Sequence, residues 1–144
     1  MSRILNVPQG NYIINVPSGK LSITSPIEMS GASSNLSYTD GSVMTLSTTS
    51  TSGTSQLTID SFAIATYRSA KYLIQLASAS SYHSIEIIII HNGTTSQIVT
   101  FGSVFAGSSL GTFATSIVSG QANLLYTPAV SGVSVKLFKH LITI

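Results

Sequence analysis

Apolar and polar residues alternate along much of the chain, and one stretch breaks this alternation with four consecutive isoleucines. The run lies in EIIIIHNGTTSQIVTFG, residues 86–102. Neighbouring side chains of a strand point to opposite faces, so Ile87 and Ile89 share one face while Ile88 and Ile90 share the other. Because both faces are apolar, we expect both sides of this strand to be covered, the second side by another part of this chain or by another copy of it.

From residue 57 onward the pattern predicts seven strands separated by turn residues, at the spacing of a β-sandwich or barrel. Asn92-Gly93 is a strong hairpin signal. Residues 66–74 could be written as a helix, but the alternation of Tyr72 and Ile74 favours a strand. The expected strands are residues 57–65, 70–78, 83–92, 96–105, 111–119, 122–129 and 133–144.

The last of these strands changes its apolar face part-way along. Val133, Val135 and Leu137 form one apolar face, whereas from Phe138 onward the opposite parity is apolar too, as far as Ile144. Two explanations are open. Either a β-bulge shifts the strand at this point, or the strand leaves its own core and contacts a partner.

The N-terminal part of the chain has a different composition. Two near-copies, NVPQG at residues 6–10 and NVPSG at residues 15–19, end in turn-forming Pro-x-Gly sequences, and residues 20–25 alternate like a short strand. Residues 30–58 are rich in Ser, Thr and Gly, a composition that alone indicates a linker. Since Thr favours strands, we instead expect a β-prone segment held against neighbouring chains.

These patterns predict an all-β protein in two parts. Residues 1–56 are expected to form an N-terminal β-rich extended stem, and residues 57–144 a C-terminal antiparallel β-sandwich that is jelly-roll-like. A chain of 144 residues buries roughly two-thirds of its unfolded surface, so it can build a core of its own.

Charge is unusually scarce. Charged residues make up 7% of the chain, against about 25% in typical soluble domains. Solubility normally requires more surface charge than this. We therefore expect much of the surface to be covered in the working state of the protein.

Composition also bears on partners and location. The net charge of +2 comes from six Lys and Arg against four Asp and Glu, without a basic stripe, so we predict no nucleic-acid partner. No apolar run reaches the roughly 18 to 20 residues of a membrane helix, and MSRILNVPQGN has too short an apolar core for a signal peptide, so we predict no membrane association. With no cysteine, the chain has neither disulfides nor thiolate metal sites.

Four segments, two long and two short, carry a family resemblance. They are residues 60–76, 86–105, 110–113 (LGTF) and 124–128 (LLYTP). Through them, residues 57–144 resemble a C-terminal β-domain of virion structural proteins, often tail-fibre-like, of tailed phages that infect marine cyanobacteria. The chain departs from this family at Ala114 and Thr115, where members often carry acidic residues, and it is much shorter than a long fibre.

The resemblance implies a virion structural subunit located in the virion. It implies self-association, as a homotrimer, with capsid, neck or tail proteins as further partners, and it provides no catalytic residue, cofactor or metal ligand to carry over. Capsid decoration, a short fibre and a neck or tail accessory piece are all compatible with it. The expectation is therefore a protein that is not an enzyme.

Residues 107–111, GSSLG, match the G-x-S-x-G pattern of a nucleophile elbow. That arrangement needs a strand, a sharp turn and then a helix whose N-terminus helps to hold the oxyanion. The next residues, TFATSIVS, predict a strand instead, and chance matches are frequent in a chain rich in Ser and Gly. We interpret this segment, Ser109 included, as a Gly-rich hairpin loop.

The three histidines, His83, His91 and His140, raise the question of a metal site or a general base. His83 and His91 share parity, but eight strand residues at about 3.3 Å each separate them by roughly 26 Å. Zinc ligands lie only about 2.0 to 2.2 Å from the ion, and Glu86 lies on the opposite face. A site would need His140 or a second chain, so we predict no metal and no cofactor.

Asp60 and Glu86 are candidates for the paired carboxylates of a glycosidase, which stand about 5 to 9.5 Å apart. Nothing in the sequence places them in one cleft. We expect Glu86 to pair with Arg68 or Lys71 instead, an interaction that contributes little at a surface. No catalytic residue is predicted.

The alternative to a purely structural role is a carbohydrate-binding module for host adhesion. Aromatic rings stack on the apolar faces of sugars, and the loops around Asn92 and Ser108, with Tyr82 and Tyr126, are the candidates for gripping a host-surface glycan. The tyrosines are dispersed among the predicted strands without a cluster. We therefore interpret four of them as residues of the core or of an interface, namely Tyr67, Tyr72, Tyr82 and Tyr126.

Overall fold

The computed structural model describes residues 35–38 and 40–144, so most of the predicted stem lies outside the described residues. Within these ranges the chain consists of strands and turns, and no helix there is long and apolar enough to cross a membrane. The strands are β1 (Asn35–Ser37), β2 (Val43–Ser50), β3 (Leu57–Ala63), β4 (Tyr67–Ala77), β5 (Tyr82–His91), β6 (Ser96–Ala106), β7 (Gly111–Val118), β8 (Gln121–Pro128) and β9 (Ser134–Thr143).

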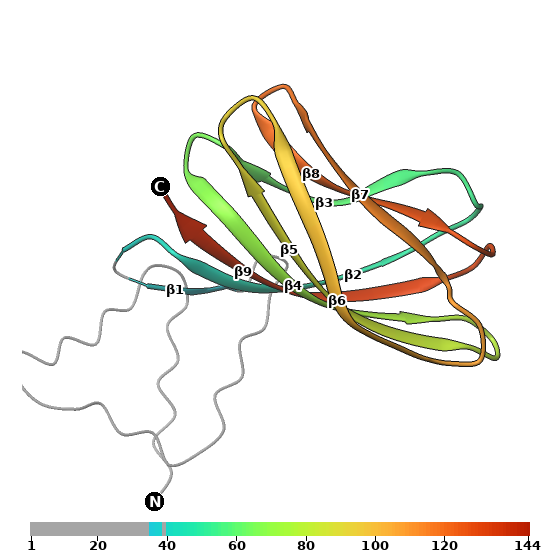
Figure 1. Ribbon diagram of the computed structural model, residues 1–144. Helices are drawn as coiled ribbons and strands as arrows, with labels where there is room; N and C mark the ends of the chain where they lie inside the picture. The colour runs from blue at the N-terminus through green and yellow to red at the C-terminus, as the bar shows by residue number, and fades with distance from the viewer. Residues whose placement is uncertain (1–34, 39) are drawn as a thin grey trace, which may run out of the picture.

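The strands form two antiparallel sheets that pack face to face (Figure 1). The large sheet has the order β1-β2-β9-β4-β5-β6, and the small sheet has the order β3-β8-β7. The prediction of an all-β antiparallel sandwich is confirmed. The seven strands expected after residue 57 are β3 to β9, each within three residues of its predicted bounds, and Asn92-Gly93 lies in the hairpin turn that joins β5 to β6.

The Thr-rich strand β2 is held by its own chain. It pairs with β9 along its whole length, from Val43 opposite Leu141 to Ser50 opposite Ser134. Beyond the strand, Thr51 exchanges two backbone hydrogen bonds with the turn before β9. The strand character expected of this segment is seen in β2. That neighbouring chains also hold the segment stays a prediction, as does the division of the chain at residue 57.

The core lies between the two sheets and explains half of the isoleucine run. Ile87 and Ile89 of β5 are fully buried, whereas Ile88 and Ile90 face outward with 36% and 51% of their surface exposed. The other buried apolar side chains come mainly from β4, β8 and β9; they include Tyr72, Ile74, Leu76, Leu124, Tyr126, Val135 and Leu137.

Strand β9 alternates without interruption. Leu137 and Leu141 face the core, and Phe138 and Ile142 face outward, with regular pairing to β2 throughout. The explanation of the parity change by a bulge in β9 is therefore wrong. The irregularity of this part of the sheet lies in β4, between Tyr67 and Ser69.

A charged pair joins the two sheets inside the sandwich. Lys139 Nζ of β9 lies 2.8 Å from Oδ2 and 3.0 Å from Oδ1 of Asp60 in β3. The hydroxyl of Tyr72 in β4 donates to Asp60 Oδ2 at 2.9 Å. Burial, the charge of Asp60 and this hydrogen bond raise the pKa of Tyr72 far above its usual value, so it remains a neutral donor.

Strand β6 forms one edge of the large sheet. Its sequence, SQIVTFGSVFA, contains no charged residue and no proline, and most of its side chains are exposed. It pairs with β5 on one side only. Natural edge strands usually carry charges, prolines or a cover that prevent pairing with another chain, and β6 has only the irregularity opposite Ser84 and Glu86.

Candidate assembly interface

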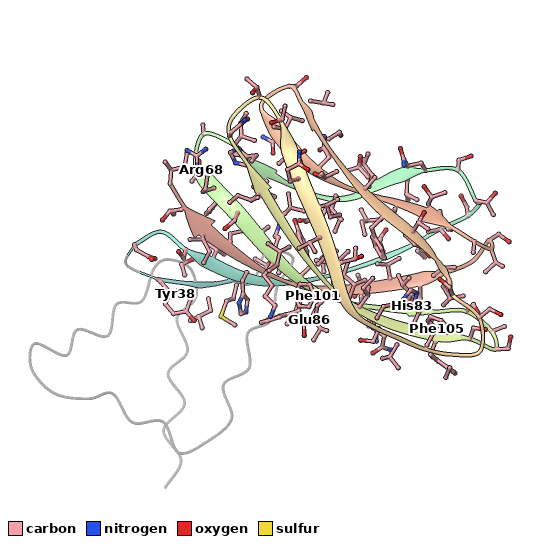
Figure 2. All side chains as sticks on the ribbon, in the orientation of Figure 1. Tyr38, Arg68, His83, Glu86, Phe101 and Phe105 are labelled. Atoms are coloured by element: carbon pink, nitrogen blue, oxygen red, sulfur yellow. The ribbon has the colours of Figure 1, made fainter. Side chains whose placement is uncertain are left out.

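The feature that stands out on the surface is the side of the large sheet that faces away from β3, β8 and β7, which we call the outer face. Its side chains alternate with those of the core. Figure 2 shows Glu86 and Phe101 on this side of the sheet. The exposed apolar residues of the outer face are Leu36, Leu46, Leu73, Tyr82, Ile88, Ile90, Val99, Phe101, Val104 and Ile142.

These residues form continuous rows across the strands. One row of directly paired residues runs through Leu46, Phe138, Leu73, Glu86 and Phe101. Opposed residues in a sheet lie about 4.5 to 5.5 Å apart. The row is therefore apolar apart from Glu86, and it spans five of the six strands.

The small sheet is more polar on its solvent side, although Ala114 is paired with Leu125 there and Val118 is exposed. There Thr112 is paired with Thr127, Ser116 with Asn123, and Asn123 also with Ser61. The two external faces of one sandwich thus differ in polarity although they share one chain. The scarcity of charged residues does not explain why the outer face is apolar. The small sheet has a polar solvent side that is made of uncharged Ser, Thr and Asn residues.

One ion pair interrupts the outer face near its centre. Lys71 Nζ lies 2.6 Å from Glu86 Oε2, and it is also 5.7 Å from the centre of the Phe101 ring. The prediction that Glu86 pairs with Arg68 or Lys71 is confirmed for Lys71. Arg68 instead donates to the backbone carbonyl of His91 at 3.2 Å.

A hollow of about 200 Å³ opens beside this ion pair. His140 of β9 lies in its wall, and its Nε2 is buried without a hydrogen-bond partner among the described residues. The ring of Phe138 packs edge-on against the imidazole at 4.8 Å. The hollow thus combines apolar walls with a few polar atoms; its lining is Lys71, Leu73, Glu86, Phe138 and His140.

A second, wider hollow of about 400 Å³ lies where β5 begins and β6 ends. Two aromatic side chains border it: Tyr82 is 55% exposed and Phe105 is 52% exposed. Gln75 from β4 supplies an amide. An exposed aromatic ring beside an amide is chemistry that can contact a sugar.

The three histidines do not come together. His83 is buried, with Nε2 2.8 Å from Ser103 Oγ, and burial lowers its pKa. His91, also buried, places Nε2 2.6 Å from the Tyr67 carbonyl oxygen. His140 lies across the sheet on the outer face. Among the described residues no group of three or more His, Asp or Glu side chains is placed to hold a metal ion.

The GSSLG segment connects β6 of the large sheet to β7 of the small sheet. The interpretation of this segment as a hairpin loop is wrong, because β6 and β7 are not paired and the loop crosses from one sheet to the other. Ser109 donates to the Gly111 carbonyl at 3.5 Å, and Leu110 is buried. A strand follows it, as the sequence predicts, where a nucleophile elbow has a helix.

The two candidate carboxylates lie on different sides of the large sheet. Asp60 points into the sandwich and Glu86 lies on the outer face. They therefore do not share a cleft. Of the tyrosines proposed for sugar contact, Tyr126 is fully buried and donates to the Leu110 carbonyl oxygen, which leaves Tyr82 as the accessible one.

No family model matches the sequence, and no curated protein matches it. The fold is similar to solved tailspike proteins of three Acinetobacter phages. That of Acinetobacter baumannii phage AM24 shares 10% identity, with a TM-score of 0.40, over 72% of this chain and 26% of that chain. Tailspike protein gp49 of Acinetobacter baumannii bacteriophage Fri1 shares 14% identity, with a TM-score of 0.46, over 77% and 20%. That of Acinetobacter phage vB_ApiP_P1 shares 17%, with a TM-score of 0.40, over 89% and 27%.

The chain thus spans between 20% and 27% of the length of these tailspike proteins. All three are tailspike proteins of Acinetobacter phages, so a cyanobacterial host is not supported. The Fri1 protein is described as a capsular polysaccharide depolymerase, which is an enzyme. This finding contradicts the prediction that the chain is not an enzyme, and that prediction is withdrawn.

Proposed function

We propose that the chain is a structural part of a bacteriophage virion, within a tail spike or fibre, and that it works by self-association through the outer face. The main support is the contrast between the apolar outer face of the large sheet and the more polar solvent side of the small sheet. Burial of apolar surface is the main driving force of protein association. Among the described residues, the outer face is the surface that gains most from a partner.

The size of the outer face suits a stable interface. Five long strands spaced about 4.8 Å apart, with about nine residues each at about 3.3 Å, cover about 700 Å². Standard interfaces bury about 800 Å² per partner. A contiguous exposed apolar patch larger than a few hundred Å² is rare on soluble monomers and marks an interaction site.

The sequence resemblance of residues 57–144 to virion structural proteins supports the location in the virion. The same resemblance supports a homotrimer and, because it is to tail-fibre-like proteins, a position in the tail ahead of capsid decoration or a neck piece. Mass spectrometry of purified phage particles should detect the chain. Cryo-electron microscopy should then place it near the tail in few copies; a position tiling the shell would contradict the tail location.

Assembly is tested on the full chain by size-exclusion chromatography with light scattering. The wild type should be oligomeric at micromolar concentration, and Ile88→Lys on the outer face should shift it to the monomer. Val118→Lys is the matched control, because Val118 is 58% exposed at the end of β7 in the small sheet. A monomeric wild type, or equal effects of both variants, would contradict the proposal.

Glycan binding is the second candidate function, favoured by the 400 Å³ hollow with its exposed aromatic border. Stacking of a sugar on an exposed ring needs no change in the fold. Glycan-array binding that is lost in Tyr82→Ala, and retained in Tyr38→Ala, would support this function. Tyr38 is a suitable control because it is also about half exposed.

A further inference from the structure

Ser103 and His83 form a hydrogen-bonded pair that the proposed assembly does not use. Ser103 Oγ of β6 lies 2.8 Å from His83 Nε2 of β5. The histidine is buried, with 3% of its surface exposed, whereas Ser103 is exposed. A serine hydroxyl within hydrogen-bond reach of an imidazole is the arrangement that activates a serine nucleophile. The hydroxyl is thus open to a substrate while the base is held inside the fold.

A β-bulge turns Ser103 toward His83. The pairing of β5 with β6 shifts register between Ser84 and Glu86. There Gly102 and Ser103 together face a single residue of β5, and Gly102 has φ at +59°, the left-handed conformation that glycine supplies in such a bulge. In unbroken alternation Ser103 would point to the outer face, and the extra residue moves it to the side on which His83 lies. Bulges re-aim side chains in this way and are frequent beside active sites.

The surroundings of His83 fit the role of a general base. Burial lowers the pKa of its imidazole, which is therefore neutral at pH 7 and able to accept a proton. The ring of Phe105 packs edge-on against it, with 5.5 Å between ring centres, and restricts its orientation (Figure 2). Nδ1 is buried without a hydrogen-bond partner among the described residues. Because no carboxylate of that part of the chain orients the imidazole, the pair is a dyad and its activity should be lower than that of a triad.

The space beside this pair suits an uncharged ester. His83 and Phe105 lie in the wall of the 400 Å³ hollow, whose lining includes the amide of Gln75 and no Lys, Arg, Asp or Glu among the described residues. Such a mainly apolar wall with a few polar groups is typical of small-molecule sites. Strand β6 is also an edge strand, so backbone N–H groups on its free side are unpaired. They are donors for the negative charge that develops on an ester carbonyl oxygen during attack.

We infer that Ser103 and His83 form a catalytic dyad for acyl transfer from uncharged esters. Ser103 Oγ attacks the ester carbonyl carbon, and its proton passes to His83 Nε2. The proton then goes to the leaving alcohol oxygen as the carbon–oxygen bond breaks, which leaves the acyl group on Ser103. Water attacks this acyl-serine in the same way, so the acid is released and the hydroxyl is restored. The inference goes beyond the proposed assembly and does not rest on it.

Hydrolysis of para-nitrophenyl acetate by the full chain tests the dyad. Ser103→Ala and His83→Gln should each lower the rate about a hundredfold, and the double variant no further, because the two groups act as one unit. Ser109→Ala is the matched control and should keep the wild-type rate, since Ser109 is an exposed serine that donates to the Gly111 carbonyl. Circular dichroism verifies that each variant is folded. Equal rates in the wild type and Ser103→Ala would overturn the inference.

A cysteine at the same position gives a readout that needs no turnover. The chain has no cysteine of its own, so iodoacetamide reports on the introduced thiol alone in Ser103→Cys. A neighbouring imidazole favours the reactive thiolate, and alkylation at neutral pH should be about tenfold faster than in Ser109→Cys. Adding His83→Gln to Ser103→Cys should remove this advantage. Equal alkylation rates in the two cysteine variants would overturn the inference and leave the proposed assembly unaffected.

Discussion

Lys139 and Asp60 lie 79 residues apart in the sequence, and their side chains meet at 2.8 Å between the two sheets. Both are largely buried, with 10% and 15% of their side-chain surface exposed. Such a pair is costly to separate, because one partner alone would remain as an uncompensated buried charge.

Asp60→Asn should therefore lower the free energy of unfolding by about 3 to 5 kcal/mol, measured by urea denaturation. The matched control is Glu86→Gln, which removes the half-exposed pair with Lys71 and should cost less than about 1 kcal/mol. Replacing all three buried partners, Asp60→Leu with Lys139→Met and Tyr72→Phe, should recover most of the loss. Equal effects of the two single variants would show that burial of the Lys139 pair has no energetic weight.

Tyr126 donates its hydroxyl proton to the Leu110 carbonyl oxygen, which anchors the crossover between β6 and β7. The same carbonyl accepts a bond from the Ala129 amide at 2.9 Å, so it is not left unpaired in Tyr126→Phe. The expected loss of unfolding free energy is about 1 kcal/mol. A loss close to zero by chemical denaturation would mean that this hydrogen bond contributes no net stability.

Alkaline pH should also act on Tyr126. Burial raises its pKa to about 12 in the folded chain, against about 10 in the unfolded chain. The folded state therefore holds the proton more tightly than the unfolded state. The contribution of the Tyr126 hydroxyl to the free energy of unfolding is complete below pH 10 and is lost as pH rises through 12. Denaturation at a series of alkaline pH values should show a smaller decline in Tyr126→Phe than in the wild type.

Acid should destabilise the fold through His83. Burial lowers the pKa of this imidazole from its ordinary value of about 6.5. The unfolded chain then binds the proton more tightly, so stability is full above about pH 6.5 and declines as pH falls through the folded pKa. As the pH is lowered from 7 into the acid range, the urea midpoint of unfolding should fall less in His83→Gln than in the wild type. An equal fall in both would show that other groups cause the acid destabilisation.

Gly111 begins β7 with φ at +149°, and a Cβ there would overlap the carbonyl oxygen of Thr127 and the ring of Tyr126. Gly111→Ala should therefore cost about 1 to 3 kcal/mol or more. Gly53→Ala is the control, because nothing lies within 4 Å of a Cβ at that position. Thermal unfolding of the two variants should separate them clearly, and similar midpoints would contradict the steric argument.

Local pattern was sufficient to predict the strands, because alternation and turn residues mark where each begins and ends. It also predicted that Ile88 and Ile90 lie on a different face from Ile87 and Ile89. Apart from the β5–β6 hairpin at Asn92-Gly93, local pattern did not predict which strands pair. Nothing local in residues 43–50 indicates that they pair with β9, and the crossover at residues 107–110 depends on which sheet receives β7.

The candidate site was predicted only in outline. Scarce charge indicated a covered surface, but the hollow depends on the side-chain directions of three adjacent strands, which no sequence pattern specifies. The buried pair had one overlooked signal. Lys139 has the same parity as Leu137 and Leu141, and a lysine on the inward face of a strand requires an anionic partner.

The uncharged edge of β6 has a consequence for how the protein must be produced. An unassembled copy exposes the backbone N–H and C=O groups on the free edge of β6. Pairing of such edges with the wrong strands leads to insoluble material. We expect the yield of soluble protein to rise when the concentration of chains during expression is high enough for rapid assembly into the correct oligomer. Val99→Lys places a charge on the edge strand β6, a substitution that opposes pairing with other strands. It should keep unassembled chains soluble.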